Sequence, residues 1–249
     1  MSTTLYISDL HLQSSNPKLT ELAFELFNTV ECEYLYILGD LFEYWIGDDS
    51  VDHTADAVSQ KLKTLHKRGT EIKVMHGNRD FLLGEEFVSA FGGTLIFEDT
   101  IKLDIAGRPT LLMHGDTLCT DDKQYQFYRR MVRNRDWQKD FLAKSVSERE
   151  ATARMIRSTS KASGSRAHNN SIADINADTL LKTVETHQVE RVIHGHTHRP
   201  ALHVTTAAQK VERMVLGDWH EDHAVIAVSD SKNCELVRWD GNSLSALVA

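Results

Sequence analysis

The sequence predicts an α/β fold in which two packed, mixed β-sheets are flanked by helices, and three observations support this prediction. Short runs rich in Val, Ile, Leu and Tyr recur along the chain. Longer amphipathic stretches with helical periodicity separate the first of these runs. Towards the carboxyl end, the runs follow one another through short loops that leave no room for helices. Strands that alternate with helices are typical of layered α/β proteins.

The apolar runs are predicted to be strands, because they are short and rich in β-branched and aromatic residues. The buried strands are expected within residues 4–8, 34–39, 71–77, 108–115 and 189–195. Three later runs, within residues 211–220, 223–230 and 234–241, are expected to form a second, antiparallel-leaning sheet packed on the first.

Two stretches between these runs predict helices. Residues 17–30 begin with Pro17, which suits the first helical position, and carry apolar residues at helical intervals. Residues 52–69 have the same character and end on Gly69, a good helix terminator. The chain therefore alternates strand and helix through its first half.

Bulk composition limits the class of protein. The 249 residues fit one large domain, 1–249, and 41% hydrophobic residues can fill its core. The three cysteines, Cys32, Cys119 and Cys234, are far apart and in no CxxC pair, which argues against a disulfide framework and a thiolate zinc site. We therefore expect a protein of the reducing cytoplasm. No apolar run approaches the roughly 18 residues of a membrane span, so any membrane contact is expected to be peripheral.

One segment differs in charge from the rest. Residues 121–166 carry twelve Lys or Arg against six Asp or Glu, within a chain whose net charge is -8. Their apolar residues, among them Trp137, Phe141 and Leu142, fall at helical spacings. We therefore expect a basic, aromatic and mostly helical insertion on the α/β body, at about residues 121–172.

Each of the five predicted buried strands ends in side chains that can bind a metal ion. These side chains are Asp9, His11, Asp40, Asn78, His114, His194 and His196. Because ligands collect beyond the carboxyl ends of strands in α/β sheets, we expect the five segments to converge. One histidine at a strand end is more often structural, but five such ends indicate a shared site.

Seven ligands suit two ions that are bridged by one carboxylate. Carboxylate, amide and imidazole without thiolate favour Mn, Fe or Zn over a structural zinc cage. Two ions roughly 3.5 to 4 Å apart can clamp the attacking and leaving oxygens of an in-line phosphoryl displacement and acidify a water molecule. The pattern therefore predicts hydrolysis of phosphate esters or anhydrides.

Five motifs in this order resemble the calcineurin-like metallophosphoesterases: Asp-x-His, Gly-Asp, Gly-Asn-Arg-Asp, His-Gly-Asp and Gly-His-Thr-His. The resemblance spans nearly the whole chain, from Leu5 to Trp219. The longer strings YILGDLFEYWIGDD, HGNRDFLLG, MHGDTLCTDD and HGHTHRP resemble one branch of this family. Members of that branch hydrolyse the pyrophosphate bond of a lipid-linked sugar nucleotide in lipid A biosynthesis, at the cytoplasmic face of the inner membrane.

The resemblance implies two manganese ions, with Fe and Zn left open. One ion is expected on Asp9, His11, Asp40 and His196, and the other on Asp40, Asn78, His114 and His194. His198 is expected to point elsewhere or to support these ligands. Catalytic roles are implied for Asp40, Asn78, Arg79, His114 and His194, and substrate contacts for Asn78, Arg79, Asp122, Ser160, Arg166 and His194.

Arg79 departs from the pattern of many relatives, which place a histidine after the motif asparagine as a general acid. A sugar 1-phosphate has a second pKa near ~6, so it leaves as an anion without a proton. An arginine supplies the positive charge that this transition state needs. We therefore expect activated water to attack the α-phosphorus and to release a nucleoside monophosphate. A salt bridge between Arg79 and Asp80 or a neighbouring residue is the alternative interpretation.

The insertion is expected to be a lid over the metal site, with apolar faces that receive acyl chains and arginines that meet phosphates or anionic headgroups. A helical decoration whose aromatic residues pack on the body is the alternative. Trp45 and Phe81 are candidates for the acyl groove or for the core.

Three other functions stay open at this stage. A metallophosphodiesterase or phosphatase for another phosphoester would use the same ions, but with a histidine in place of Arg79. A non-catalytic scaffold of the same fold would have lost ligands, and this chain keeps all seven. A nucleic-acid binder would carry a reading motif beside its basic segment, and none is present. No obligate protein partner is inferred.

Overall fold

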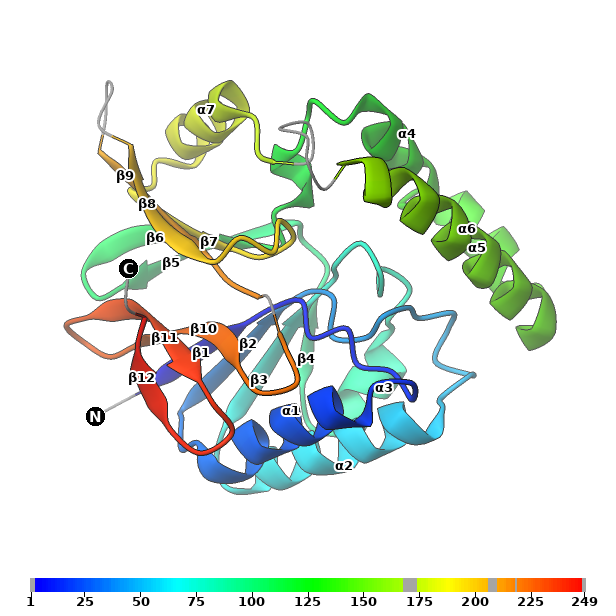
Figure 1. Cartoon of the computed structure of the whole chain (residues 1–249), viewed down its shortest axis with the longest axis horizontal. Coiled ribbons are helices and arrows are strands. Elements are labelled where there is room, and N and C mark those ends of the chain that lie inside the picture. The colour runs from blue at the N-terminus through cyan, green and yellow to red at the C-terminus, as the bar shows by residue number, and fades with distance from the viewer. Residues whose placement is uncertain (1–2, 168–173, 206–209, 218, 248–249) are drawn as a thin grey trace.

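The computed structural model describes residues 3–167, 174–205, 210–217 and 219–247, and for residues 157–167 it describes the backbone alone. Two stacked sheets form its body (Figure 1). The first sheet contains β1 (Thr4–Ile7), β2 (Tyr34–Leu38), β3 (Glu71–Met75), β4 (Thr94–Ile96), β10 (Ala224–Ser229), β11 (Cys234–Trp239) and β12 (Leu244–Ala246). The second contains β5 (Thr100–Ile105), β6 (Arg108–Met113), β7 (Arg191–His194), β8 (Ala201–Thr205) and β9 (Val211–Val215).

Both sheets are mixed. The seven-stranded sheet has the order β12-β11-β10-β1-β2-β3-β4, in which β1 to β4 run parallel and β10 pairs antiparallel with β1. The five-stranded sheet has the order β5-β6-β7-β9-β8, in which β6, β7 and β9 run parallel. The predicted class, two mixed sheets flanked by helices, is confirmed.

Helices cover the outer face of each sheet, as Figure 1 shows. The first sheet is covered by α1 (Pro17–Thr29), α2 (His53–Lys67) and α3 (Glu85–Ala90), and the second by α7 (Ala177–His187). The first two helices match the predicted ones, and each begins at a side-chain cap: Asn16 Oδ1 accepts from Leu19 N, and Asp52 Oδ1 accepts from Ala55 N. The strands β4, β5, β8 and β12 and the helices α3 and α7 were not predicted.

The body has four layers of secondary structure: the helices α1 to α3, the first sheet, the second sheet and α7. Three layers of apolar side chains lie between them. Alternate residues of one strand enter different layers, because successive side chains of a strand point to opposite faces. Ile37 of β2 packs under the helices, whereas its neighbour Leu38 packs between the sheets. A third layer joins Val192 of β7 to Leu180 of α7. The body is thereby fixed from both sides of each sheet.

The prediction that the three C-terminal runs form a second sheet is wrong. Only β9 belongs to the second sheet, whereas β10 and β11 extend the first sheet beside β1. The physical reason lies in β10, which is apolar on both faces. Its Ile226 enters the layer under the helices, and Val225 enters the layer between the sheets. Such a strand fits the interior of a covered sheet.

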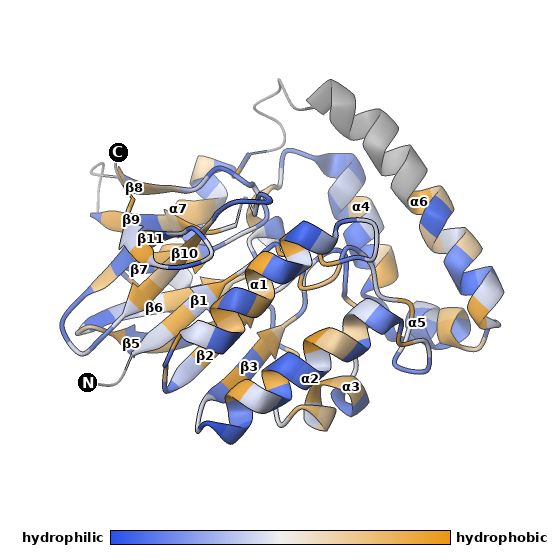
Figure 2. Cartoon of the chain, turned by 60° about the horizontal axis from the view of Figure 1, so that its bottom comes forward, coloured by the Kyte–Doolittle hydropathy of each residue, from blue (hydrophilic) through white to orange (hydrophobic). Residues whose placement is uncertain are grey.

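A group of three helices projects from one side of this body (Figures 1 and 2). These are α4 (Lys123–Val132), α5 (Arg135–Leu142) and α6 (Val146–Ala167), which follow the short 3-10 helix η1 (Asp116–Leu118). We call α4 to α6 the insertion. Phe141 is buried in the core beneath α1 to α3, and Trp137 packs against the same core. The insertion is therefore anchored by aromatic side chains on its inner face.

Candidate metal centre

Loops after five strands meet at one point. We call Asp9, His11, Asp40, Asn78, His114 and His196, which come from these loops, the strand-tip cluster. His114 Nε2 lies 2.9 Å from Asn78 Oδ1 and 3.7 Å from Asp40 Oδ2. His196 Nδ1 lies 2.8 Å from Asn78 Oδ1, and its backbone N–H donates to both oxygens of Asp9 at 2.9 and 3.1 Å. Both sheets thus contribute to one site.

Two glycines allow the loops to approach this closely. A Cβ on Gly77 would lie 2.0 Å from Asp40 Oδ1, and a Cβ on Gly195 would lie 2.0 Å from Asp9 Oδ2. Either distance is far below contact, and the obstructing atoms belong to the cluster itself. The glycines of Gly-Asn-Arg-Asp and Gly-His-Thr-His therefore leave room for the two carboxylates.

The backbone of the cluster is strained. Asp9, His11, Asp40, His196 and His198 all have positive φ, between 49° and 66°, a region that residues with a Cβ rarely adopt. Such residues persist only where the surrounding structure holds them, and they gather at functional sites.

Asp80 is one group that holds the strained loops in place. Its buried carboxylate accepts from the backbone N–H of Gly77 at 2.8 Å, Asp40 at 3.2 Å and Leu41 at 2.7 Å. These bonds tie the loop after β2 to the loop after β3. Asp80 is thus occupied by backbone donors, and no described carboxylate forms an ion pair with Arg79.

The two buried carboxylates sit in opposed electrostatic surroundings. Burial resists ionisation of Asp9, but the hydrogen bond and charge of His198, with the charges of His114 and His11, hold its pKa well below the usual range. Burial raises the pKa of Asp40, and His114 and His11 only partly offset this. A divalent cation among these groups would stabilise both carboxylates as anions.

Burial favours the neutral form of two histidines, His194 at the end of β7 and His196 in the loop after it. Burial lowers the pKa of His196 to about 3, with the charge of His114 as the next cause. Burial and then the charge of Arg213 lower the pKa of His194 to about 4. A neutral imidazole keeps the lone pair that binds a metal ion.

A cavity of about 330 Å³ opens beside the cluster. Its lining includes His11, Asp40, Asn78, Arg79, His196 and His198. A larger hollow of about 460 Å³ lies along α7, but Thr120, Thr179, Lys182 and other scattered polar residues line it and bring no cluster of ligands. The lining side chains therefore indicate that the smaller cavity is the functional site.

A model of calcineurin-like phosphoesterases matches residues 2–200. The chain belongs to the calcineurin-like phosphoesterase family. A relative from Cellvibrio japonicus (strain Ueda107), named UDP-2,3-diacylglucosamine hydrolase, is 45% identical over 95% of this chain and 99% of its own. A protein of the same name from Marinobacter nauticus is 44% identical, covering 88% of this chain and 91% of its own. A solved structure of an archaeal phosphodiesterase is 15% identical, with coverage of 95% and 99% and a TM-score of 0.47.

The calcineurin-like phosphoesterase fold implies a site for two metal ions, and the residues present fit it. Asp9, Asp40 and His114 offer ligand atoms within 4.8 Å of one another, as do Asp9, His11 and His198. His114 Nδ1 donates to Leu38 O at 2.9 Å, so in the neutral ring the Nε2 lone pair faces Asn78 Oδ1. Two facing acceptors of this kind suit a cation.

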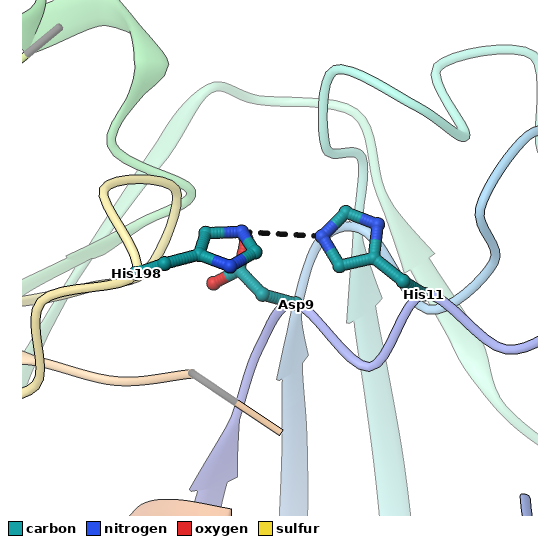
Figure 3. A group of neighbouring side chains, drawn as sticks. All are labelled: Asp9, His11 and His198. Atoms are coloured by element: carbon teal, nitrogen blue, oxygen red, sulfur yellow. Dashed lines mark hydrogen bonds and ion pairs between the residues drawn. The ribbon is translucent and has the colours of Figure 1, made fainter. Parts of the chain in front are cut away.

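His198 lies in the site, although the sequence pattern suggested a supporting or outward position. Its Nε2 is 3.2 Å from His11 Nε2 and 3.5 Å from Asp9 Oδ1 (Figure 3). Every second residue of HGHTHRP is a histidine, and His198 shares the positive φ of His196. This regular spacing was the feature of the sequence that could have placed His198 in the site.

His194 does not belong to either group of ligand atoms, and both of its ring nitrogens have other partners. Its Nδ1 donates to Gly195 O at 2.8 Å, and its Nε2 accepts from Arg213 Nη1 at 3.2 Å. Arg213 comes from β9, which pairs with β7, so the guanidinium reaches the imidazole across neighbouring strands. Its role as a metal ligand stays a prediction.

The predicted substrate contacts lie in different surroundings. Arg79 lines the cavity, and its backbone N–H donates to Asp40 Oδ1 at 2.7 Å. Asp122 caps α4 by accepting from Tyr125 N at 2.8 Å, so its carboxylate has a structural use. The side chains of Ser160 and Arg166 fall outside those that the structure describes.

The insertion touches the cluster through α4. Tyr125 lies with its ring 5.6 Å from the ring of His196, and its hydroxyl donates to Asp116 at 2.5 Å. Arg129 Nε also donates to Asp116, at 2.8 Å, and Arg133 Nη2 donates to Gly77 O at 2.9 Å. Arginines of the insertion were expected to bind phosphates, but Arg129 and Arg133 fix the insertion to the loops at the strand ends.

Proposed function

We propose that this protein hydrolyses the pyrophosphate bond of UDP-2,3-diacylglucosamine, giving UMP and 2,3-diacylglucosamine 1-phosphate for lipid A biosynthesis. The observation that carries the proposal is the meeting of Asp9, Asp40, Asn78, His114 and His196 from two sheets. Relatives that bear this activity in their name match the chain almost end to end. The proposed enzyme is a hydrolase that acts on a phosphorus-containing anhydride.

The proposed ligands are those of the sequence prediction, with Asp40 shared between the two ions. Two bound divalent ions, for which we propose manganese, supply the Lewis acidity that activates a water molecule and neutralises phosphate charge. The chain's own part is to hold its carboxylates and neutral imidazoles at fixed positions. His194 would join this set if its Nε2 gave up the hydrogen bond from Arg213.

Arg79 is proposed to stabilise the departing sugar phosphate. It lines the cavity beside Asn78, and Asp80, its expected alternative partner, is occupied by backbone donors. A guanidinium without a competing carboxylate can form two parallel hydrogen bonds to a phosphate. Such a group acts where negative charge develops and transfers no proton.

The insertion is proposed to be the lid that receives the acyl chains. Its outer residues include apolar side chains with large exposed fractions: Phe127 66%, Met131 41%, Leu142 41% and Met155 64%. In contrast, Phe141 is buried in the body's core, so it supports the lid rather than lining it. Exposed apolar side chains among many basic residues also suit peripheral contact with the cytoplasmic face of the inner membrane. No helix in the described part of the chain is long and apolar enough to cross a bilayer.

Hydrolysis in ¹⁸O-labelled water tests the function and the site of attack together. The manganese-loaded protein is given UDP-2,3-diacylglucosamine, and both products are weighed by mass spectrometry. We expect one ¹⁸O in UMP and none in the sugar phosphate. Label in the sugar phosphate would contradict attack at the α-phosphorus, and failure to release UMP would contradict the proposed substrate.

A further inference from the structure

The cavity beside the strand-tip cluster is separate from the insertion. All of its lining residues come from the loops after β1, β2, β3 and β7 and from the start of α1. The insertion reaches the cluster elsewhere, through Tyr125 against the ring of His196 and Arg133 at Gly77 O. Figure 1 likewise shows α1 and the insertion at different sides of the strand ends. The cluster therefore has this cavity on one side and the insertion on another.

The part of the cavity near α1 is polar but has few charges. Gln13, Asn16, Leu19 and Glu43 line it, and Arg79 is the only lysine or arginine among the described residues that line the cavity. Glu43 is paired with His11 Nδ1 at 2.8 Å. The described lining residues there offer no further lysine or arginine to a second phosphate. They do offer two amides and an apolar side chain, which suit a neutral ring with polar edges.

The two carboxamides retain donors for a ligand. Asn16 Oδ1 accepts from Leu19 N at 3.4 Å, which commits its oxygen to the cap of α1. Neither Asn16 Nδ2 nor the carboxamide of Gln13 forms a hydrogen bond with another described residue. Leu19 supplies apolar surface beside them. A uracil ring offers two carbonyl acceptors and one N–H donor on an otherwise apolar plane, which these groups complement.

The proposed reaction places the two halves of the substrate on different sides of the cluster. The α-phosphorus joins the uridine half to the sugar phosphate half, so both halves must extend from the cluster. If the exposed apolar side chains of the insertion receive the acylated sugar, the cavity near α1 is available for the uridine. A volume of about 330 Å³ lies within the range of small-ligand sites.

We propose that the part of this cavity near α1 is the subsite for the uridine half of the substrate, in which Gln13 and Asn16 hydrogen-bond to the uracil ring and Leu19 packs against it. This inference rests on the proposed function. The residues act in binding the base and have no part in activating water or holding a metal.

Inhibition by product fragments tests the subsite in the full-length, manganese-loaded protein. The variants are Gln13→Met, which keeps the length of the side chain, and Asn16→Asp, which keeps the helix cap but removes the Nδ2 donor. Gln60→Met, an exposed amide on α2, is the matched control. Three inhibitors are compared: UMP, ribose 5-phosphate, which lacks the base, and 2,3-diacylglucosamine 1-phosphate.

We expect each subsite variant to weaken inhibition by UMP about three- to tenfold, the effect of losing one hydrogen bond. Inhibition by ribose 5-phosphate and by the acylated sugar phosphate should stay unchanged, as should all three in the control. Unchanged inhibition by UMP, or an equal loss for ribose 5-phosphate, would overturn the subsite while wild-type hydrolysis of UDP-2,3-diacylglucosamine still supported the function. A wild-type protein that failed to hydrolyse this substrate would overturn the proposed function and the subsite with it.

Discussion

The strand-tip cluster and the insertion are held in place by different means. The cluster depends on the main chain: positive φ at its ligands, glycines that admit its carboxylates, and Asp80 bonded to three backbone N–H groups. The insertion depends on side chains, namely aromatic residues that pack on the core and arginines that reach the body. Arg149 of α6, which is 2% exposed, bonds to Asp49 and to Ile46 O.

From this difference we expect the cluster to determine turnover and the insertion to determine substrate binding. Main-chain support fixes the ligand positions closely, so a change in the cluster should remove turnover. Side-chain anchors fix only the position of the insertion, so changes there should weaken substrate binding while leaving the metal site intact. The comparison predicts a loss of kcat in the first region and a rise of KM in the second.

The largest effect is expected from Asp40→Asn. The substitution removes the negative charge of the carboxylate proposed to bridge both ions, and metal ions contribute several kcal/mol to such transition states. We expect kcat to fall about a thousandfold or more, with loss of bound manganese. Asp56→Asn, on the exposed face of α2, is the control and should leave both unchanged. Near-normal turnover in Asp40→Asn would contradict the assigned role.

A smaller loss is expected from Asp80→Asn, which touches no substrate. One carboxylate oxygen accepts from the backbone N–H groups of Gly77 and Asp40, and the other accepts from that of Leu41. The carboxamide nitrogen that replaces one of these oxygens cannot accept, so the N–H groups bonded to that oxygen lose their acceptor. We expect kcat and manganese affinity to fall about 10- to 100-fold, as for partners of metal ligands. Denaturant unfolding should show a loss of about 1.5–3 kcal/mol. A destabilised variant with unchanged manganese affinity would show that Asp80 serves folding alone.

The anchor of the insertion is tested by Arg149→Met. The apolar chain can stay buried, but the bonds to Asp49 and Ile46 O are lost. We expect KM for UDP-2,3-diacylglucosamine to rise about tenfold with kcat and manganese content nearly constant. Arg154→Met on the same helix is the control, because the pair that Arg154 forms among the described side chains, with Glu150, is exposed and such pairs contribute little. Equal changes of KM in the two variants would contradict the role of Arg149 as the anchor of the insertion.

The smallest effect is expected from Phe127→Ser, which removes an exposed apolar side chain of α4 without disturbing the core. If the acyl chains lie on this surface, KM should rise about three- to tenfold, the contribution of a partly buried aromatic side chain. The measurement compares acylated substrate with UDP-glucosamine, for which KM should not change. An equal change for both would argue against acyl recognition.

The sequence predicted much of the site because its signals are local. Strand ends, glycines and ligand residues can be read from motifs such as Gly-Asn-Arg-Asp. The assignment of β10 to the first sheet could not be read, since a strand apolar on both faces fits either sheet. Helical spacing placed Phe141 on a face of the insertion but did not show that this face packs on the core. The contact between His194 and Arg213 depends on how β7 pairs with β9.

Manganese binding tests the central claim most directly, namely that remote strand ends form one site for two ions. Protein freed of metal with a chelator is titrated with manganese, and bound metal and UMP release are measured on the same samples. We predict about two ions per chain at saturation, with UMP release absent from the metal-free protein and restored on loading. Equal UMP release from metal-free and loaded protein, or no manganese bound at saturation, would contradict the account.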